Sequence, residues 1–587
     1  MINALTSITP FGDTALLVGV EDDRAARQLA VRIQADAEPP PGIGETVIGL
    51  RTVLVHIDPV MADPAGIQDW LNRLGSSLAS APSAPAPSAA APSPDGPGRV
   101  VEIPVTFDGP DLDDVAEAID ATVDEVAALL TSVDLRVAFL GFAPGFPYLV
   151  GLPPPLAAIQ RRASPRTRVP PGSVAVAAGF AAVYPQPSPG GWQLLGSTDV
   201  SLFDPDTPPF ALLRAGDTVR FTCTDDTAAR SRRPGRSDSL ADSRAPDAAP
   251  GPDAPIPTRA LLRASTDRYI EILEPGTFTL MQDAGRQGVA AIGVPTAGAA
   301  DPDGFRLANR LIGNSETAAA LEMTAHGPTI RFSSAGYIAV VGDVALRLDE
   351  RQVAADAVVP VGAGQVLAVG PMRQSLRSYL ALAGGLEGPV VLGSRSSDVL
   401  SGLGLGPLHA GDQVDLGKPG HPRGRLTYPE PSPTLRVVSG PHHATDAELQ
   451  KLSRARWKVD DRSNRVGLRL VSGSDPTGGT GATGGTAETL MKAPVAGIPS
   501  CGMVTGAIQI PPDGQPIVLM PDHATVGGYP VIAAVISADW GALGRLRPGD
   551  DVRFELVSVG TARALRREHE RILNGSVSGW FPTDSGS

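Results

Sequence analysis

Residues 139–149 read FLGFAPGFPYL, an uncharged stretch that holds four aromatic side chains, two glycines and two prolines. Such apolar content is typical of a protein core, but the glycines and prolines are incompatible with a regular helix or a central strand. Aromatic residues make up only 4% of the chain, so this stretch is a local concentration of them. The pattern leaves two interpretations open: the wall of a binding pocket, or a rigid turn filled with hydrophobic side chains.

The composition of the chain indicates several β-rich domains. Its 587 residues are too many for one hydrophobic core, and about three to five domains are expected. With 66 glycines and 58 prolines, the chain should form many turns and few long helices. A net charge of -14 argues against a nucleic-acid partner. Two cysteines can build neither a disulfide framework nor a thiolate zinc site, so no metal is expected.

Neither a targeting signal nor a membrane span is predicted. The first residues, MINALTSITPFGD, lack the basic and apolar regions of a secretory signal. No run of about 18 uninterrupted apolar residues occurs, so no membrane partner is expected. These patterns predict a cytoplasmic protein.

Low-complexity segments divide the chain into two halves. Residues 79–98 and 226–258 are rich in Pro, Ala and Ser or in Pro, Asp and Arg, which predicts linkers, and 473–486 predicts a glycine-rich loop. Each half ends on a Gly-Asp turn followed by an alternating strand, LLRAGDTVRF (212–221) and RLRPGDDVRF (545–554), which could close a barrel. Helices are expected at 121–131 and 301–313 from their capping residues, and a third helix is expected at 445–457.

Four glycine-rich or proline-rich turns carry the polar side chains that could form a site. They are QDAGRQG (282–288), GSRSSD (393–398), RRASPRTRVPPGSV (161–174) and PDHATVGGYP (521–530). Glycines let backbone amides approach an anion or a carbonyl, and arginines bind carboxylates in a bidentate manner. The alternative is that these side chains only stabilise turns.

From these turns we predict the site residues. The expected catalytic residues are Asp283, Arg286, Asp398 and Asp522. The expected substrate-binding residues are Arg166, Arg168, Gln282, Arg395, Ser396, Thr525 and Tyr529, with Phe142, Phe146 and Tyr148 from the aromatic stretch. Arg166 and Arg168 would form a second site, for an anionic group.

Two further residues invite a chemical interpretation. Cys501 is the one candidate nucleophile, with an inert buried thiol as the alternative. Lys492 in ETLMKAP is only faintly similar to the modified lysine of a biotin carrier.

The first half resembles the B subunit of 5-oxoprolinase, also called allophanate hydrolase subunit 1 and related to a kinase inhibitor. The likeness rests on FGDTALLV (11–18), FLGFAPGFPYLVGL (139–152), PRTRVPPGSVAVAAG (165–179) and YPQPSPGGWQLLG (184–196). The second half resembles the C subunit of 5-oxoprolinase, or allophanate hydrolase subunit 2. Its motifs include MQDAGRQGVAAIGVPTAGAADPDGFRLANRLIGN (281–314), VLGSRSSDVLSGLG (391–404), SNRVGLRL (463–470) and GAIQIPPDGQPIVLMPDHATVGGYPVIAAVISAD (506–539).

The resemblance implies a mainly β fold with α+β elements: three cyclophilin-like β-barrel domains and a small N-terminal α/β domain. In this chain we expect the α/β domain at 1–78, a linker at 79–98 and a first barrel at 99–225. A disordered linker at 226–265, barrels at 266–425 and 426–560 and a C-terminal tail at 561–587 would follow.

The resemblance also implies a function. The chain would be a fused B–C subunit of an ATP-dependent 5-oxoprolinase-type amidohydrolase complex acting on a small lactam, amide or urea. ATP would be bound through the complex, with a 5-oxoprolinase A-type subunit as partner, and a homo-oligomer is possible. One alternative is a biotin-dependent carboxyltransferase component that works with biotin carboxylase and biotin carrier subunits. Another is a non-catalytic regulatory protein of the kinase-inhibitor type.

The chain departs from the family pattern at several positions. A His is missing near Leu130, an Arg is replaced by Ser197, and a Gln-Thr pair by residues 180–182. In the second half Pro407, Cys501 and Ala524 stand where the family has Arg, Glu and Gln. Each change removes a hydrogen-bonding or ionisable group, which implies either a different substrate or a non-catalytic role.

Overall fold

The computed structural model describes residues 4–79, 99–224, 261–422, 424, 426, 434–442, 444–473 and 498–577. The expected linkers at 79–98 and 226–265 and the loop at 473–486 lie largely outside these residues, and Lys492 lies entirely outside them. In the part of the chain that is described, no helix is long and apolar enough to cross a membrane.

The N-terminal segment forms a four-stranded antiparallel sheet whose two faces are both covered. The strands are β1 (Leu5–Phe11), β2 (Ala15–Val20), β3 (Ile43–Ile48) and β4 (Thr52–Ile57), in the order β1-β2-β4-β3. Helices α1 (Asp23–Ala35) and α2 (Pro64–Ala79) pack against Val18 and Val55 on one face. Leu17 and Leu54 on the other face belong to a hydrophobic cluster shared with the end of the chain. A strand buried on both faces explains why β2 reads as the apolar run ALLVGV.

The rest of the first half is a seven-stranded sheet that nearly closes on itself. Its order is β12-β9-β10-β7-β6-β13-β5, and its edge strands meet through two hydrogen bonds of 2.9 Å between Thr106 and Ser197. The strands are β5 (Val100–Val105), β6 (Asp134–Leu140), β7 (Pro147–Val150), β9 (Ser173–Ala177), β10 (Phe180–Val183), β12 (Gln193–Ser197) and β13 (Thr218–Cys223). Strands β8 (Arg166–Val169) and β11 (Ser188–Gly190) form a separate ribbon.

Three helices accompany this sheet. They are α3 (Leu112–Ala118), α4 (Val123–Thr131) and α5 (Pro154–Ala157). Helix α4 confirms the helix expected at 121–131, because Thr122 and Glu125 form the predicted capping box.

The second half begins with two sheets around one core. The six-stranded sheet has the order β20-β19-β22-β17-β14-β24, and the five-stranded sheet β15-β16-β23-β18-β21. Their strands are β14 (Tyr269–Glu274), β15 (Phe278–Gln282), β16 (Ala320–Thr324), β17 (Thr329–Phe332), β18 (Gly336–Val341), β19 (Val344–Leu348), β20 (Arg351–Val353), β21 (Val358–Val361), β22 (Val366–Met372), β23 (Arg377–Leu382) and β24 (Gln413–Asp415). The short turn η1 (Ala290–Ile292) and helix α7 (Pro302–Leu311) lie between β15 and β16, and α7 begins at the expected cap, Asp301.

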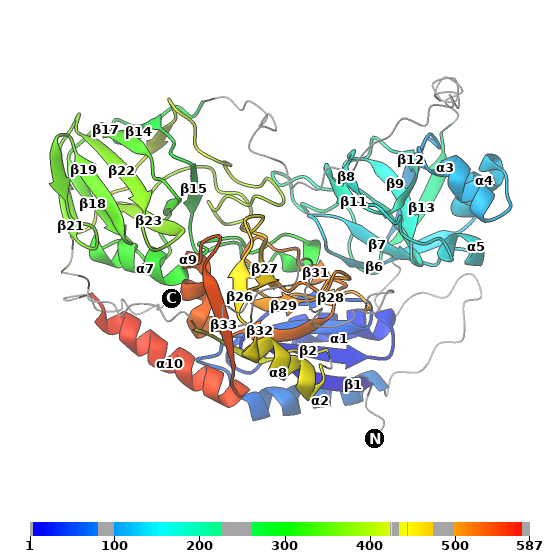
Figure 1. The fold of residues 1–587 in the computed structure, drawn as a ribbon. Coiled ribbons are helices and arrows are strands. Elements are labelled where there is room, and N and C mark those ends of the chain that lie inside the picture. The colour runs from blue at the N-terminus through cyan, green and yellow to red at the C-terminus, as the bar shows by residue number, and fades with distance from the viewer. Residues whose placement is uncertain are drawn as a thin grey trace, which may run out of the picture.

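The last domain is a closed barrel at the centre of the molecule (Figure 1). Its order is β25-β32-β29-β30-β27-β26-β33, from strands β25 (Thr434–Ser439), β26 (Trp457–Val459), β27 (Gly467–Ser472), β29 (Ala507–Gln509), β30 (Ile517–Leu519), β32 (Val531–Val535) and β33 (Asp551–Leu556). Strands β28 (Cys501–Gly502) and β31 (Val526–Gly527) pair beside it, and η2 (Ser537–Asp539), α8 (Asp446–Arg454) and α9 (Trp540–Arg545) complete it.

The mainly β prediction is confirmed, and the count of three barrels is not. In the described residues one barrel is closed, one sheet is nearly closed, and the segment from 269 to 415 forms two separate sheets. The segment expected as a C-terminal tail, 561–587, contains most of helix α10 (Val559–Gly575). Polar contacts such as the ion pair between Arg306 and Glu570 anchor this helix. The spacing of hydrophobic residues in the sequence does not predict such contacts.

The turn inside FLGFAPGFPYL joins the first half to the second. The Gly145 amide donates to the Ile292 carbonyl at 2.8 Å. A Cβ on Gly293 would lie 2.4 Å from the Ala143 carbonyl oxygen, and a Cβ on Gly141 would lie 2.4 Å from Cγ2 of Val526. Glycine is therefore required at both positions, because a side chain at 293 would meet the Ala143 backbone and one at 141 would meet the Val526 side chain.

Further contacts bring the N-terminal sheet against the last barrel, and Figure 1 shows the two side by side. The buried carboxylate of Asp13 accepts hydrogen bonds from the Ser537 amide at 2.9 Å and the Ser537 hydroxyl at 2.6 Å. The Leu50 amide donates to the Ser500 carbonyl at 2.9 Å. The two halves thus share one hydrophobic cluster and several buried hydrogen bonds.

The junction predicts a difference between two glycine substitutions. Gly293 and Gly288 both have a positive φ, of 82° and 77°, but a Cβ at position 288 meets nothing within 4 Å. Gly293→Ala should therefore lower the free energy of unfolding by about 1–3 kcal/mol more than Gly288→Ala, because only the former overpacks the contact with Ala143. Urea unfolding of the two variants measures the difference, and equal losses would contradict the tight junction.

Candidate functional site

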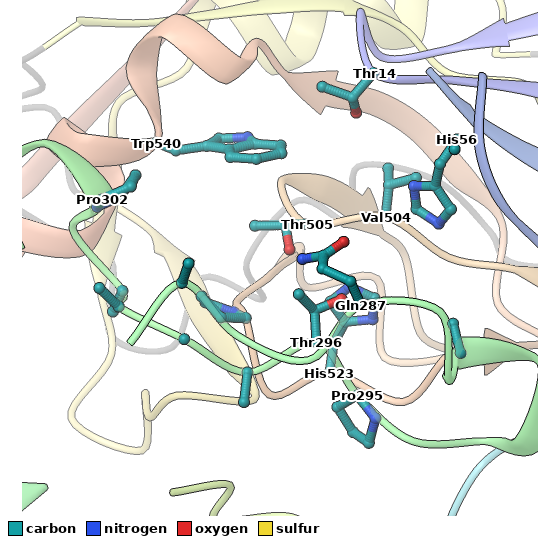
Figure 2. A pocket seen from close by; sticks show the side chains of 18 of the residues that line it. Thr14, His56, Gln287, Pro295, Thr296, Pro302, Val504, Thr505, His523 and Trp540 are labelled. Carbon is teal, nitrogen blue, oxygen red and sulfur yellow. The ribbon is translucent and has the colours of Figure 1, made fainter. Parts of the chain in front are cut away.

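A cavity of about 530 Å³ lies between the two halves. The N-terminal sheet and its loops contribute Thr14, Gly44, Glu45, Val47, His56, Ile57 and Asp58 to its wall. The turn before α7 and α7 itself contribute residues between Asp283 and Arg306, and the last barrel contributes residues between Met503 and Leu543. In Figure 2 the Trp540 indole and the His56 imidazole lie on opposite sides of this space, with Gln287 and Thr505 between them. Neither half alone encloses it.

Two polar residues of the last barrel, His523 and Thr525, contribute to the wall of the cavity. Nδ1 of His523 lies 2.8 Å from the Ala524 carbonyl oxygen, and a carbonyl only accepts. Nδ1 therefore carries the proton, and Nε2 is left as a lone-pair acceptor. The Thr525 side chain is 4% exposed, and its hydroxyl has no hydrogen-bond partner among the described residues. A ligand N–H could donate to Nε2 of His523, whereas the Thr525 hydroxyl has almost no accessible surface.

His56 reaches the cavity from the outer face of the N-terminal sheet. It stands two residues after Leu54 on β4, so both side chains point towards the second half. Burial, and secondarily the neighbouring His523, lower the pKa of His56 to about 4. Burial also lowers the pKa of His523. Both imidazoles are therefore neutral at pH 7.

The charged groups of the wall are mostly carboxylates that are already engaged. Glu45 accepts a hydrogen bond from the Ala290 amide at 2.9 Å, and burial raises its pKa. Arg306 is bound by Glu316 at 2.6 Å and by both carboxylate oxygens of Glu570 at 2.8 and 3.0 Å. The wall therefore presents neutral polar groups and negative charge rather than an available cation.

The predicted residue Asp283 lies in the wall but is held by four donors. It accepts from the hydroxyls of Ser394 and Ser396 at 2.5 and 2.6 Å, and from the amides of Arg395 and Gly285 at 2.6 and 2.9 Å. Burial alone would raise its pKa, but these hydrogen bonds outweigh burial and lower the pKa. This carboxylate positions the turns at 282–288 and 393–398 against each other.

Arg286 and Gln282 are buried behind that wall. Arg286 is 1% exposed and donates through Nε to the Val391 carbonyl at 3.2 Å, and its terminal nitrogen Nη2 donates to the Ser396 carbonyl. Gln282 is fully buried and donates to the Ser397 carbonyl at 2.8 Å. Nη1 of Arg286 and Oε1 of Gln282 have no partner among the described side chains and backbone. Burial lowers the pKa of Arg286.

Asp522 belongs to a buried ion-pair network whose centre, Arg465, is not among the predicted site residues. Arg465 donates to Asp522 at 3.0 and 2.7 Å, to Glu322 at 2.5 Å and to the Gly298 carbonyl at 2.6 Å. Glu322 also accepts from the Tyr379 hydroxyl at 2.6 Å. The available signal was the SNRVGLRL motif, in which Arg465 occupies a buried turn position before β27.

Asp398 lies next to this network. The Val399 amide donates to Asp522 at 3.0 Å, which places Asp398 close to that carboxylate. Burial and the nearby negative charge of Asp522 raise the pKa of Asp398 to about 6. The four predicted catalytic residues are thus brought together, but only Asp283 borders the cavity.

The predicted arginines of the first half lie elsewhere. Arg166 forms a bidentate pair with Asp111 at 2.9 and 2.7 Å, and Arg168 is exposed. In the second half Arg395 pairs with Glu387, and Tyr529 is 40% exposed. None of these four predicted residues is among those that line the cavity.

The three aromatic residues predicted to bind substrate instead pack with one another. Phe146 and Tyr148 are 1% and 7% exposed, and their ring centroids lie 5.2 Å apart. Phe142 packs on Phe146 at 5.2 Å, and Trp192 lies 5.7 Å from both Phe146 and Tyr148. The cluster supports the rigid-turn interpretation of FLGFAPGFPYL, since these rings lie outside the cavity wall.

Cys501 is a buried thiol. Its sulfur lies 3.8 Å from Nε2 of His442, whose Nδ1 accepts from the Val531 amide at 3.1 Å. Burial raises the pKa of Cys501 to about 12. The thiol is therefore protonated at pH 7, which agrees with the inert alternative.

The buried network predicts a large loss of stability when its cation is removed. Arg465→Met leaves Glu322 and Asp522 without their shared partner, so the free energy of unfolding should fall by about 3–5 kcal/mol. Arg469→Met, at an exposed position on the next strand, is the control and should change stability by less than about 0.5 kcal/mol. Similar urea midpoints for both variants would contradict the structural role of Arg465.

His56 predicts a pH dependence of stability. Its pKa is lowered from 6.5 to about 4 in the folded chain, so the unfolded chain binds the proton more readily between these values. Stability contributed by neutral His56 is complete above pH 6.5 and is lost as pH falls towards 4. Between about pH 7 and 5, the melting temperature of His56→Gln should therefore fall less than that of the unchanged chain. His421→Gln, at an exposed position, should follow the unchanged chain, and a parallel curve for His56→Gln would refute the prediction.

Two family models match the chain. The carboxyltransferase domain, subdomain C and D, matches residues 6–213, and the carboxyltransferase domain, subdomain A and B, matches residues 292–556. The crystal structure of TTHA0988 superimposes with a TM-score of 0.72 at 31% identity and covers 92% of this chain and 99% of that chain.

Curated relatives match each half. The C subunit of 5-oxoprolinase from Escherichia coli (strain K12) is 33% identical over 51% of this chain and 96% of its own length. The B subunit of 5-oxoprolinase from Haemophilus influenzae is 34% identical over 37% of this chain and 96% of its own length. Urea amidolyase of Lachancea kluyveri is 31% identical over 53% of this chain, which spans 18% of that enzyme.

Proposed function

Since the chain belongs to the carboxyltransferase-domain family, with halves similar to the B and C subunits of 5-oxoprolinase, we propose that it is a fused B–C subunit of an ATP-dependent amidohydrolase complex. The substrate would be a small lactam, amide or urea, bound in the cavity between the halves. The observation that carries the proposal is that this cavity is enclosed by both halves together. A site shared by the B-like and C-like halves would explain why the two are fused in one chain.

The polar atoms of the cavity suit an N–C=O group. Nε2 of His523 would accept the amide N–H, and the Gln287 side-chain amide would donate to the carbonyl oxygen. The Gln287 amide projects into the same space (Figure 2). The neutral imidazole of His56 would contact the other end of the ligand. The nucleophile would be water or a partner's group, because the one cysteine of this region, Cys501, is protonated and lies outside the cavity.

A triphosphate does not fit this cavity. Phosphate groups need several available cations or backbone amides. The guanidinium in the wall, Arg306, is held by two glutamates, and Glu45 already occupies the amide of Ala290. In the proposal ATP is therefore bound by a partner, a 5-oxoprolinase A-type subunit.

The match to urea amidolyase favours one second candidate, a carboxyltransferase component. Biotin on a carrier subunit would supply the carboxyl group, with a biotin carboxylase as a further partner. The neutral, partly apolar wall with Trp540 and Val504 is compatible with the uncharged ureido ring of biotin. The residues of this chain would then only orient the acceptor nitrogen.

The experiment combines the purified chain with a candidate ATP-hydrolysing partner and measures ADP release with 5-oxoproline, 2-pyrrolidinone, acetamide and urea. We expect release that depends on both proteins and on one of these compounds. His523→Ala should lower kcat/KM at least about tenfold, because a hydrogen bond to the reacting group is lost. Thr207→Val, at an exposed position of the first half, should change nothing. The absence of ADP release with all of these compounds would overturn the amidohydrolase proposal. Carboxylation of urea in the presence of biotin carboxylase and carrier would favour the second candidate.

A further inference from the structure

We propose that the cavity between the halves selects an uncharged amide, lactam or urea and excludes ligands that carry a carboxylate. The inference rests on the proposed function, because it assumes that the cavity is the substrate site. It goes further by naming the charge of the substrate.

Carboxylates outnumber cationic side chains in the wall of the cavity. Among the described residues that line the cavity, the carboxylates are Glu45, Asp58, Asp283 and Glu316, and the guanidinium is that of Arg306. The two imidazoles, His56 and His523, add no positive charge at neutral pH. A carboxylate that entered would meet like charges, and its desolvation would not be repaid.

The guanidinium of Arg306 in the wall is not available to bind a ligand carboxylate. Arg306 donates to Glu316 at 2.6 Å and makes a bidentate pair with Glu570 at 2.8 and 3.0 Å. Glu570 is fixed in turn by Arg566 of the same helix, α10. A ligand carboxylate would have to displace Glu570, which would then keep only Arg566 as its partner among the described residues.

Backbone amides near the cavity that could bind an anion already donate to carboxylates of the protein. Amides of Gly288, Val289 and Ala290 are already engaged by the Glu45 carboxylate. The first turn of α7 borders the cavity at Pro302, but its amides at Asp303 and Gly304 donate to the Asp301 side chain at 3.1 and 3.0 Å. The protein's own carboxylates therefore occupy both positions at which a substrate carboxylate would be stabilised.

The remaining polar atoms match a neutral amide. His523, which is 9% exposed, presents the lone pair of Nε2. The nearby Gln287 amide offers both a donor and an acceptor (Figure 2). These groups pair with N–H and C=O without any net charge on the ligand.

The test compares two ligands that differ only in the carboxylate, 2-pyrrolidinone and 5-oxoproline. Binding to the full chain is measured by saturation-transfer NMR titration at neutral pH, without ATP or partner. We expect 2-pyrrolidinone to bind at least about tenfold more tightly than 5-oxoproline, because a buried unpaired charge costs more than about 1.4 kcal/mol. His523→Ala should weaken binding of 2-pyrrolidinone severalfold, while the matched surface change His421→Ala should leave it unchanged.

Each outcome decides the inference. Equal or tighter binding of 5-oxoproline would overturn it, as would the absence of 2-pyrrolidinone binding to the unchanged chain. Binding of 2-pyrrolidinone that His523→Ala does not affect would show that the ligand occupies another place, and would overturn it too. Failure of ADP release with a partner, together with selective binding here, would refute the proposed complex but leave the charge selectivity standing.

Discussion

The Ala143 carbonyl lies so close to the backbone of Gly293 that no side chain fits at position 293, and this contact holds together the two halves that line the cavity. The Gly145 amide, 2.8 Å from the Ile292 carbonyl, fixes the same two segments. On the other side of the turn, Gly141 lies against Val526, next to Thr525, which lines the cavity. A rigid turn in the first half thus sets the position of polar atoms contributed by the second half.

Buried charge supports the opposite wall of the cavity. Arg465 holds Glu322, Asp522 and the Gly298 carbonyl, and Gly298 itself lines the cavity. Asp283, held by Ser394 and Ser396, fixes the neighbouring turn. A network of this kind adds little net stability compared with an apolar core, but it imposes one arrangement, since each broken pair leaves a buried charge. We interpret it as the frame that keeps the cavity wall in place.

The sequence predicts the parts of the molecule better than their contacts. Capping residues locate α4 and α7, and the turns at 282–288, 393–398 and 521–530 do converge, because family motifs and turn chemistry are local signals. The role of the N-terminal sheet was missed, because its outward face at Leu54 and His56 looks like an ordinary strand until the second half covers it. A histidine in the apolar strand TVLVHI was the available signal. The aromatic rings of FLGFAPGFPYL pack against one another and against Trp192.

The central claim is that the two halves form one body around a shared cavity. It is tested most directly by placing a specific protease site within residues 226–258, cutting the purified chain there, and following it by size-exclusion chromatography without denaturant. The account predicts that both fragments elute together at the volume of the intact 60.4 kDa chain, because the buried contacts between the halves remain. Elution of two separate, folded fragments would contradict it.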